Sequence, residues 1–164
     1  MDLLKRKPNR LRNYDYSHPG MYFVTVCTCG KEKTLGEIVG DGFPVPRLSS
    51  AGKLTEEAIR RIARRFPTVQ VDSYVIMPNH LHMILLFSED CGTGDPSPTL
   101  GEVMGWFKYQ VTKEVNRARS TPGEKVFQRS FHDHVIRNEE DYLRIWQYID
   151  TNPMKWQEDR YYST

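Results

Sequence analysis

A short apolar segment at residues 74–87 carries two histidines and constrains this chain more than any other feature. Side chains alternate along an extended strand, so after Pro78 His80 and His82 share one face and Leu81 points the other way. A buried imidazole needs a polar partner, because an unpaired buried polar group costs free energy. Two interpretations stay open: a pair of hydrogen-bonded core histidines, or a pair that binds one metal ion.

The length of 164 residues is typical of one domain, so we expect a single domain over residues 1–164. The net charge of +2 says little about partners, but positive charge is concentrated near the start of the chain. Residues 1–20 form a basic arm that either contacts phosphates or is a solvated terminus. Its candidate phosphate contacts are Lys5, Arg6, Lys7, Arg10 and Arg12.

The three cysteines, Cys27, Cys29 and Cys91, are an odd number, and no signal-peptide pattern precedes them. Both features favour a reducing, cytoplasmic location. Cys27 and Cys29 could supply half of a zinc site, but strand packing is the preferred interpretation. No apolar run approaches the roughly 18 residues of a spanning helix, so no membrane association is expected.

Hydrophobic periodicity predicts three helices and several strands. One helix carries basic residues on an exposed face, Arg60, Arg61 and Arg64, which serve either solubility or phosphate contacts. A flexible linker is expected at 88–98, where glycines and prolines gather. The expected elements are a strand at 21–28, a hairpin or loop at 37–46, a helix at 51–66, strands at 68–74 and 80–87, a helix at 99–119, one or two short strands within 126–136, and a helix from Asn138 to Asn152. This order predicts an α+β sandwich, an antiparallel sheet with helices packed on it.

A metal ion on two histidines keeps open positions and can polarise a phosphoryl oxygen for attack. A tyrosine can be the attacking group, because its phosphotyrosine product can be attacked in a second transfer. Of nine tyrosines, Tyr109 is expected to face solvent and Tyr142 to lie in the last helix's packing face, with Ile145, Trp146 and Ile149.

Tyr148 flanks that packing face, and Asn152 lies one helical turn later on the same side. The amide oxygen of Asn152 and two imidazoles would make a mixed site suited to Mg²⁺ or Mn²⁺. The alternative is that Tyr148 is a boundary residue and Asn152 a helix cap. A second His-x-His pair, His132 and His134, could contact phosphate, assist proton transfer, stack on a base or itself bind the metal.

Five segments carry a further pattern: RNYDY at 12–16, YFVTVCT at 22–28, VIMPNHLH at 75–82, FQRSFHDHVIRN at 127–138 and YIDTNP at 148–153. These segments, in this order, resemble those of the REP-associated tyrosine transposases, a branch of the HUH single-tyrosine transposases. The resemblance implies a ferredoxin-like sheet whose central strand carries the histidine pair. It also implies that His80, His82 and Asn152 bind the metal and that Tyr148 is the nucleophile.

From this resemblance we expect metal-dependent nicking and joining of single-stranded DNA beside palindromic hairpins, through a 5′-phosphotyrosine. The alternative from another class is a domesticated protein that binds DNA hairpins without productive cleavage. A phosphodiesterase with a histidine nucleophile is disfavoured, because no repeated His-x-Thr pattern occurs. The resemblance leaves open whether the protein is a monomer or a homodimer, and which group is the general base. It offers no match for the glycine-rich linker around Gly92 or for the loop at 40–46, so it leaves the mode of hairpin recognition open.

Overall fold

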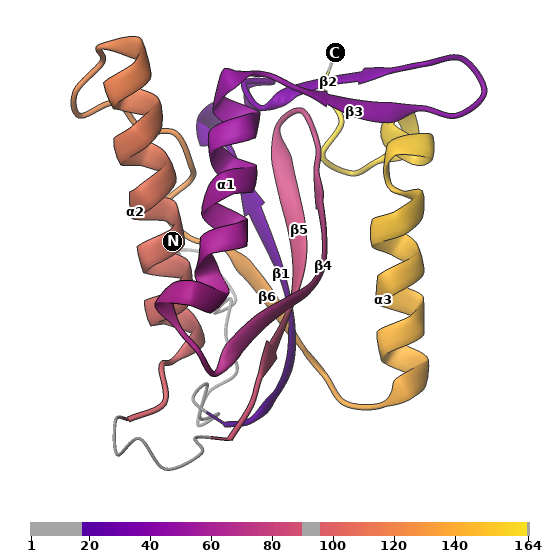
Figure 1. Cartoon of the computed structure of the whole chain (residues 1–164). Helices are drawn as coiled ribbons and strands as arrows, with labels where there is room; N and C mark the ends of the chain where they lie inside the picture. Colours follow the sequence, from indigo (N-terminus) through magenta and orange to yellow (C-terminus); the bar gives the residue numbers. More distant parts are fainter. Residues whose placement is uncertain (1–17, 90–95, 164) are drawn as a thin grey trace, which may run out of the picture.

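The computed structural model describes residues 18–89 and 96–163 and shows three α-helices and six β-strands in them (Figure 1). The predicted elements are present, and their ends differ from expectation by only a few residues. They are β1 Gly20–Cys27, β2 Gly36–Val39, β3 Val45–Leu48, α1 Ser50–Arg65, β4 Val69–Ile76, β5 His80–Phe87, α2 Leu100–Arg119, β6 His132–Ile136 and α3 Glu139–Thr151, with short 3-10 turns at Cys29–Lys31 and Pro153–Glu158.

Four strands form one antiparallel sheet in the order β4-β5-β1-β6. In this sheet β1, α1 and β4 make a crossover unit, and β5 is inserted between its two strands. This is the split βαβ arrangement of ferredoxin-like folds, so the predicted fold class is confirmed. The two strands at the centre of the sheet are β5 and β1, and β5 carries the histidine pair.

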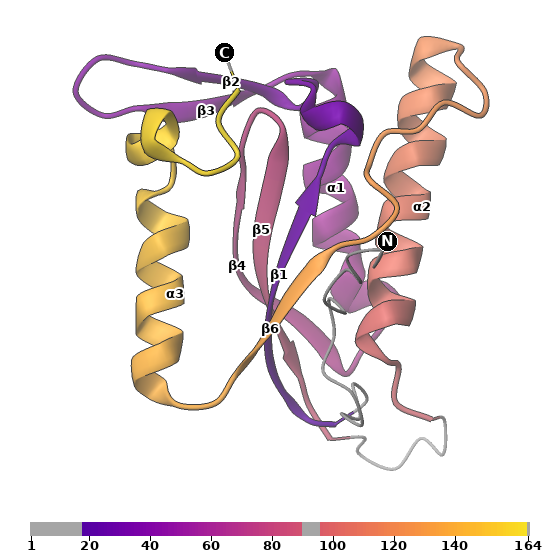
Figure 2. The same ribbon diagram turned by 180° about the vertical axis from the view of Figure 1, so that it is seen from behind.

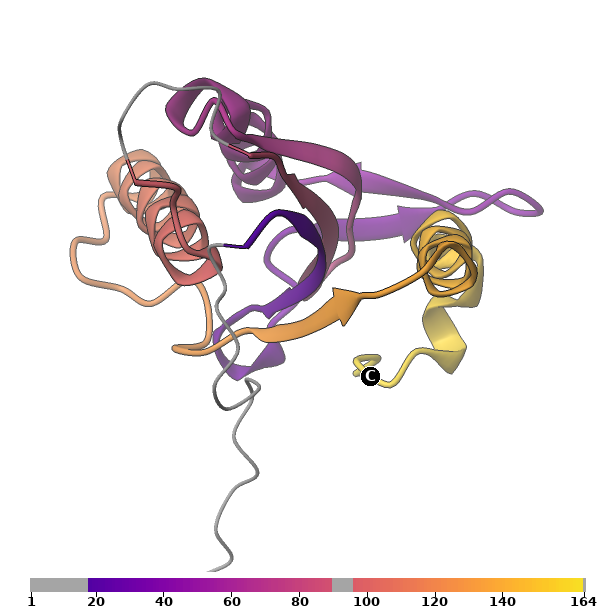
Figure 3. The same cartoon turned by 90° about the horizontal axis from the view of Figure 1, so that it is seen from below.

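The two faces of the sheet are covered unequally: α1 and α2 pack on one face, and α3 lies on the other (Figure 3). Alternate residues of β5 serve the two sides. Leu81, Met83 and Leu85 belong to the large core under α1 and α2, whereas Ile84 joins the smaller cluster beneath α3. His80 and His82 have the parity of Ile84, so they face α3.

Capping fixes the starts of the two helices on the large core. The side chain of Thr99 accepts a hydrogen bond from the Glu102 backbone N–H, and the Glu102 carboxylate accepts one from the Thr99 backbone N–H, which confirms the predicted capping box of α2. At α1, Ser49 caps the helix through the Gly52 N–H. A Cβ at Gly52 would lie 2.0 Å from the Leu35 carbonyl oxygen, so this close approach requires glycine.

Three local features were less visible in the sequence. Residues 36–48 form a separate two-stranded ribbon that projects past the end of α3 (Figures 1 and 2), with the Phe43 side chain 84% exposed. Only one regular strand, β6, forms within 126–136, and Phe127 makes an isolated bridge to Thr28. The placement of Trp146 in the packing face of α3 was wrong, since its side chain is 43% exposed.

In the part of the chain that is described, no helix is long and apolar enough to cross a membrane.

Candidate metal and nucleophile site

The histidines of β5 are fully enclosed beneath α3 and the C-terminal segment, with His80 0% and His82 1% exposed. One ring nitrogen of each is held by a polar neighbour. His80 Nδ1 lies 2.8 Å from Asn79 Oδ1, and His82 Nδ1 lies 2.7 Å from Thr25 Oγ1 on β1. An amide oxygen can only accept, so His80 carries its proton on Nδ1, and the Nε2 lone pair is left available.

Both imidazoles are held neutral. Burial lowers the pKa of His80 to about 4, and a nearby carboxylate, Asp159, opposes the shift only in part. Burial also lowers the pKa of His82, and the neighbouring His80 and Arg160 lower it further. A neutral imidazole oriented through one nitrogen is the form that binds a metal ion through the other.

The segment after α3 brings two oxygen-bearing side chains to the histidines. Asn152 is 2% exposed, and its amide nitrogen donates to Asp159 Oδ2 at 2.8 Å. The other carboxylate oxygen of Asp159 accepts from the Tyr161 backbone at 2.8 Å, and Oδ2 lies 3.8 Å from His80 Nε2. Asp159 is therefore fixed beside the histidine pair.

Three buried atoms of this group have no hydrogen-bond partner: His80 Nε2, His82 Nε2 and the Asn152 side-chain oxygen. Buried polar atoms of a folded protein are rarely left unpaired, and such atoms suggest an ion or ligand. Ligand atoms of His80, His82 and Asp159 lie within 4.8 Å of one another. The donors present thus fit a divalent cation.

Tyr148 lies over this group from α3. Its ring centroid is 5.1 Å from that of His82 and 6.2 Å from that of Phe23, and the residue is 37% exposed. Burial and the nearby Asp159 raise the pKa of Tyr148 to about 12, with a contact to Asn152 opposing the shift. The phenol is therefore protonated at neutral pH in the metal-free protein.

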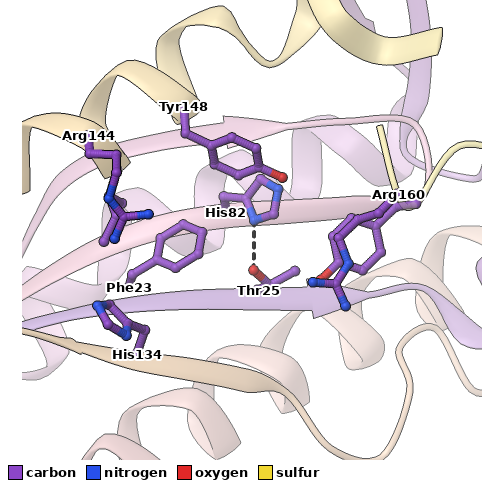
Figure 4. Close-up of a pocket in the computed structure, with 9 residues that line it drawn as sticks. Phe23, Thr25, His82, His134, Arg144, Tyr148 and Arg160 are labelled. Atoms are coloured by element: carbon purple, nitrogen blue, oxygen red, sulfur yellow. Dashed lines mark hydrogen bonds between the residues drawn. The ribbon is translucent and has the colours of Figure 1, made fainter. Parts of the chain in front are cut away.

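A cavity of about 420 Å³ opens beside Tyr148 and reaches both His82 and the edge strand β6. Figure 4 shows the Tyr148 hydroxyl directed toward the end of the cavity where Arg160 lies, with Arg144 and His134 at the opposite end. A cavity with cations at both ends beside a phenol and a candidate cation site can accommodate an anionic chain such as nucleic acid.

The other predicted contacts are distributed unevenly. His134 lines the cavity and His132 is exposed on the same strand, so neither belongs to the His80 cluster. Arg60, Arg61 and Arg64 lie on α1, on the opposite side of the sheet from His80 and His82. The basic-arm residues, Lys5, Arg6, Lys7, Arg10 and Arg12, fall outside the described residues.

The two competing tyrosines considered from the sequence, Tyr109 and Tyr142, lie away from the histidines. Tyr161, by contrast, lines the cavity, and its ring centroid is 4.5 Å from that of His80. Tyr109 is 63% exposed on α2, across the sheet, as expected. The Tyr142 hydroxyl donates to Asp72 at 2.8 Å. Neither lines the cavity beside His82.

Sequence reasoning missed Asp159, Thr25, Arg144 and Arg160. Asp159 lies in a polar segment without periodicity, seven residues after Asn152, and no pattern distinguishes it from the acidic residues around it. Thr25 could have been suspected, because it lies within the first predicted strand, but its partner depends on the strand register.

Comparisons with known proteins agree with the fold and with the motifs. No family model matches the chain. An uncharacterized Haemophilus influenzae protein is 33% identical over 96% of this chain and 93% of its own length. A REP-associated tyrosine transposase of Escherichia coli is 27% identical over 66% of this chain and 58% of its own length.

Two solved structures share the fold. A REP-associated tyrosine transposase bound to a REP hairpin matches with a TM-score of 0.65, at 24% identity, over 89% of this chain and 73% of its own. A Deinococcus radiodurans protein proposed to be a transposase matches with a TM-score of 0.52, at 15% identity, over 87% of this chain and 95% of its own. The chain is thus similar to REP-associated tyrosine transposases, in sequence to one of them over 66% of its length and in fold to another.

Proposed function

We propose that this protein cuts and rejoins single-stranded DNA beside hairpins, with Tyr148 as the nucleophile and a divalent cation held by His80, His82 and Asn152. One observation carries the proposal: the Tyr148 ring lies against His82, next to three buried ligand atoms that lack a partner. Asp159 joins the proposed metal site as a further ligand or as the group that orients Asn152.

In the proposed reaction the Tyr148 phenol oxygen forms a bond to the scissile phosphorus. The bond from that phosphorus to the 3′-oxygen breaks, and the 3′-oxygen takes up a proton. The products are a 5′-phosphotyrosine and a free 3′-hydroxyl, and attack by a 3′-hydroxyl reverses the step to join strands. The phenol proton is transferred to a water molecule in the open cavity or to a proton-accepting group of the substrate.

The surroundings of Tyr148 suit this role. A Mg²⁺ or Mn²⁺ ion held by His80, His82 and Asn152 would supply Lewis-acid polarisation of the phosphate and would lower the pKa of groups beside it. Arg160, at the end of the cavity toward which the hydroxyl points, offers a cation to the transferred phosphate (Figure 4). Because Tyr148 lies on His82 of its own chain, we expect it to act in cis, in a monomer or within each protomer of a homodimer.

The hairpin substrate is proposed by analogy with the relative whose structure holds a REP hairpin. The basic arm and the α1 arginines remain proposed contacts to DNA away from the scissile phosphate. If they bind phosphates, affinity will fall steeply with salt. The free thiols of Cys27 and Cys29 are consistent with the proposed cytoplasmic location.

A denaturing gel of labelled single-stranded hairpin DNA, taken from sequence that flanks the gene, tests the proposal. With Mn²⁺ or Mg²⁺ we expect a covalent protein–DNA band that Tyr148→Phe abolishes. Tyr109→Phe is the matched control, because it removes an exposed hydroxyl across the sheet and should leave the band intact. A metal-dependent band that survives in Tyr148→Phe would assign the nucleophile to another residue.

The hairpin-binding alternative makes a different prediction. If wild type and Tyr148→Phe bind a panel of flanking hairpins equally and neither forms a covalent band with any metal, the protein is a binder. Titration of wild type with Mn²⁺ adds an independent readout, because a pure binder has no need of a tight cation site at His80 and His82.

A further inference from the structure

The end of the cavity away from the Tyr148 hydroxyl contains side chains that cleavage itself does not require. Phe23 of β1, His134 of β6 and Arg144 of α3 meet there (Figure 4). The strand register explains two of them. Thr25 of β1 lies opposite His82 of β5. Two residues earlier on the same face of β1, Phe23 lies opposite His134 of β6, so this end of the cavity adjoins the proposed metal ligands.

Asp141 fixes the polar members of this end. One of its carboxylate oxygens is 2.7 Å from His134 Nε2, and the other accepts from Arg144. The Asp141 backbone N–H in turn donates to the Asn138 side chain, the cap of α3. The Arg144 guanidinium donates to Asp141, and the Arg144 side chain is 71% exposed.

Arg144 has five N–H donors, and Asp141 engages only part of this set. The Asp141 carboxylate contacts His134 through Nε2 alone, so this contact does not involve the other ring nitrogen, Nδ1. The polar side of this end therefore presents the remaining guanidinium donors and an imidazole edge to anything that enters the cavity.

Phe23 supplies an apolar surface among these groups. Its ring stacks on His82, with centroids 5.3 Å apart and an interplanar angle of 27°, and it remains partly exposed to the cavity. An aromatic ring beside cationic side chains is the usual platform for an unpaired nucleobase, because stacking is tolerant of sequence and the cations attract the backbone. The cavity volume of about 420 Å³ falls within the typical range for small-ligand sites.

We propose that Phe23, Arg144 and His134 form a subsite for one unpaired nucleobase next to the scissile phosphate. The base stacks on Phe23, and Arg144 contacts its edge. This inference rests on the proposed function and adds a determinant of cleavage-site choice to it. Arginine pairs best with the O6 and N7 acceptors of guanine, so we expect guanine to be the preferred base at this position.

A purely structural role for the same residues predicts something different. In that case Asp141 only ties β6 to α3 through His134 and Arg144, and removal of Arg144 would affect stability but no single nucleotide of the substrate. Base dependence therefore separates the two interpretations.

The experiment combines Arg144→Gln with substrates that carry an abasic site at each nucleotide flanking the cut in turn. For wild type, removal of the base at one position should reduce kcat/KM by roughly 5- to 150-fold, the discrimination expected of one good arginine–base contact. On intact DNA, Arg144→Gln should have a kcat/KM lower than that of wild type by a similar factor. For this variant, removal of the same base should reduce kcat/KM little further, and guanine should no longer be preferred at that position. An equal loss from Arg144→Gln on intact and abasic DNA would overturn the inference, because it would assign the arginine to the backbone.

Two controls complete the design. Arg119→Gln removes an exposed arginine from α2 and reports the general electrostatic contribution. Phe23→Tyr should keep the base dependence that Phe23→Leu loses, and Mn²⁺ titration of both variants shows whether His82 has moved.

Failure of the proposed function gives a distinct result. If wild type forms no covalent product, binding is measured in the Tyr148→Phe background by fluorescence anisotropy with the same oligonucleotides. A position at which base removal weakens binding only when Arg144 is present supports the subsite without cleavage. Absence of any such position refutes it.

Discussion

Asp159→Asn is the most informative single substitution, because it changes one charge and almost no volume at the centre of the proposed metal site. The Asp159 side chain is 1% exposed, lies 3.8 Å from His80 Nε2 and accepts from Asn152. Loss of a partner that orients metal ligands costs about 10- to 100-fold in metal affinity. A lost direct ligand would cost at least as much.

The effect can be read from thermal unfolding. At a free Mn²⁺ concentration of about 100 times the wild-type Kd, binding stabilises the native state by about 2.7 kcal/mol. That corresponds to a Tm rise of about 5–11 °C for a domain of this size. If Asp159→Asn weakens the affinity 10- to 100-fold, the same concentration contributes only about 0.4–1.4 kcal/mol, or about 1–6 °C.

The assay is differential scanning calorimetry of each protein in EDTA and in Mn²⁺, with isothermal titration for Kd. Asp150→Asn is the matched control, because Asp150 is exposed on α3 and its replacement should leave the metal-induced shift unchanged. If Asp159→Asn lowers the Tm in EDTA but binds Mn²⁺ as tightly as wild type, Asp159 has only a structural role. The ligand set would then be His80, His82 and Asn152.

Four further outcomes are expected. Thr25→Val should keep the fold but weaken Mn²⁺ binding by about 10- to 100-fold, measured by titration, because Thr25 orients His82 through Nδ1. Mixing Tyr148→Phe with His82→Ala should not restore cleavage on a gel if the tyrosine acts in cis, and restoration would show exchange between chains. Phe107→Ala, in the fully buried core beneath α2, should cost about 3–5 kcal/mol in urea unfolding. The hydrogen bond from His134 lowers the pKa of Asp141. Asp141 therefore stabilises the fold above its ordinary pKa and loses this contribution as pH falls through the lowered pKa. In acid unfolding experiments, the difference in stability between wild type and Asp141→Asn should accordingly disappear.

Most of the fold could be predicted from the sequence because its signals are local. The period of apolar residues, the capping box at Thr99 and the Asn138 cap fix the helices without any knowledge of their neighbours. The family resemblance supplied the ferredoxin-like topology. Trp146 was misplaced because helical periodicity predicts which side of α3 is apolar but not how far the sheet beneath it extends.

The site was only half predictable for the same reason. His80 with His82 and Tyr148 with Asn152 are pairs within one strand and one helix, so their spacing alone shows that they share a face. Asp159, Arg160 and Arg144 act across elements, and their relevance depends on where the chain turns after α3 and how α3 crosses the sheet. Such contacts leave no periodic signal.

The two faces of the sheet have different roles, one in stability and the other in the proposed function. Two helices on one face enclose a continuous apolar core, which allows the other face to hold neutral histidines, a buried carboxylate and an unpaired amide oxygen. Those groups cost stability when no cation offsets them. Binding of a cation would remove that cost, so the same residues that weaken the metal-free fold should make metal binding and the ordering of the segment after α3 strongly coupled.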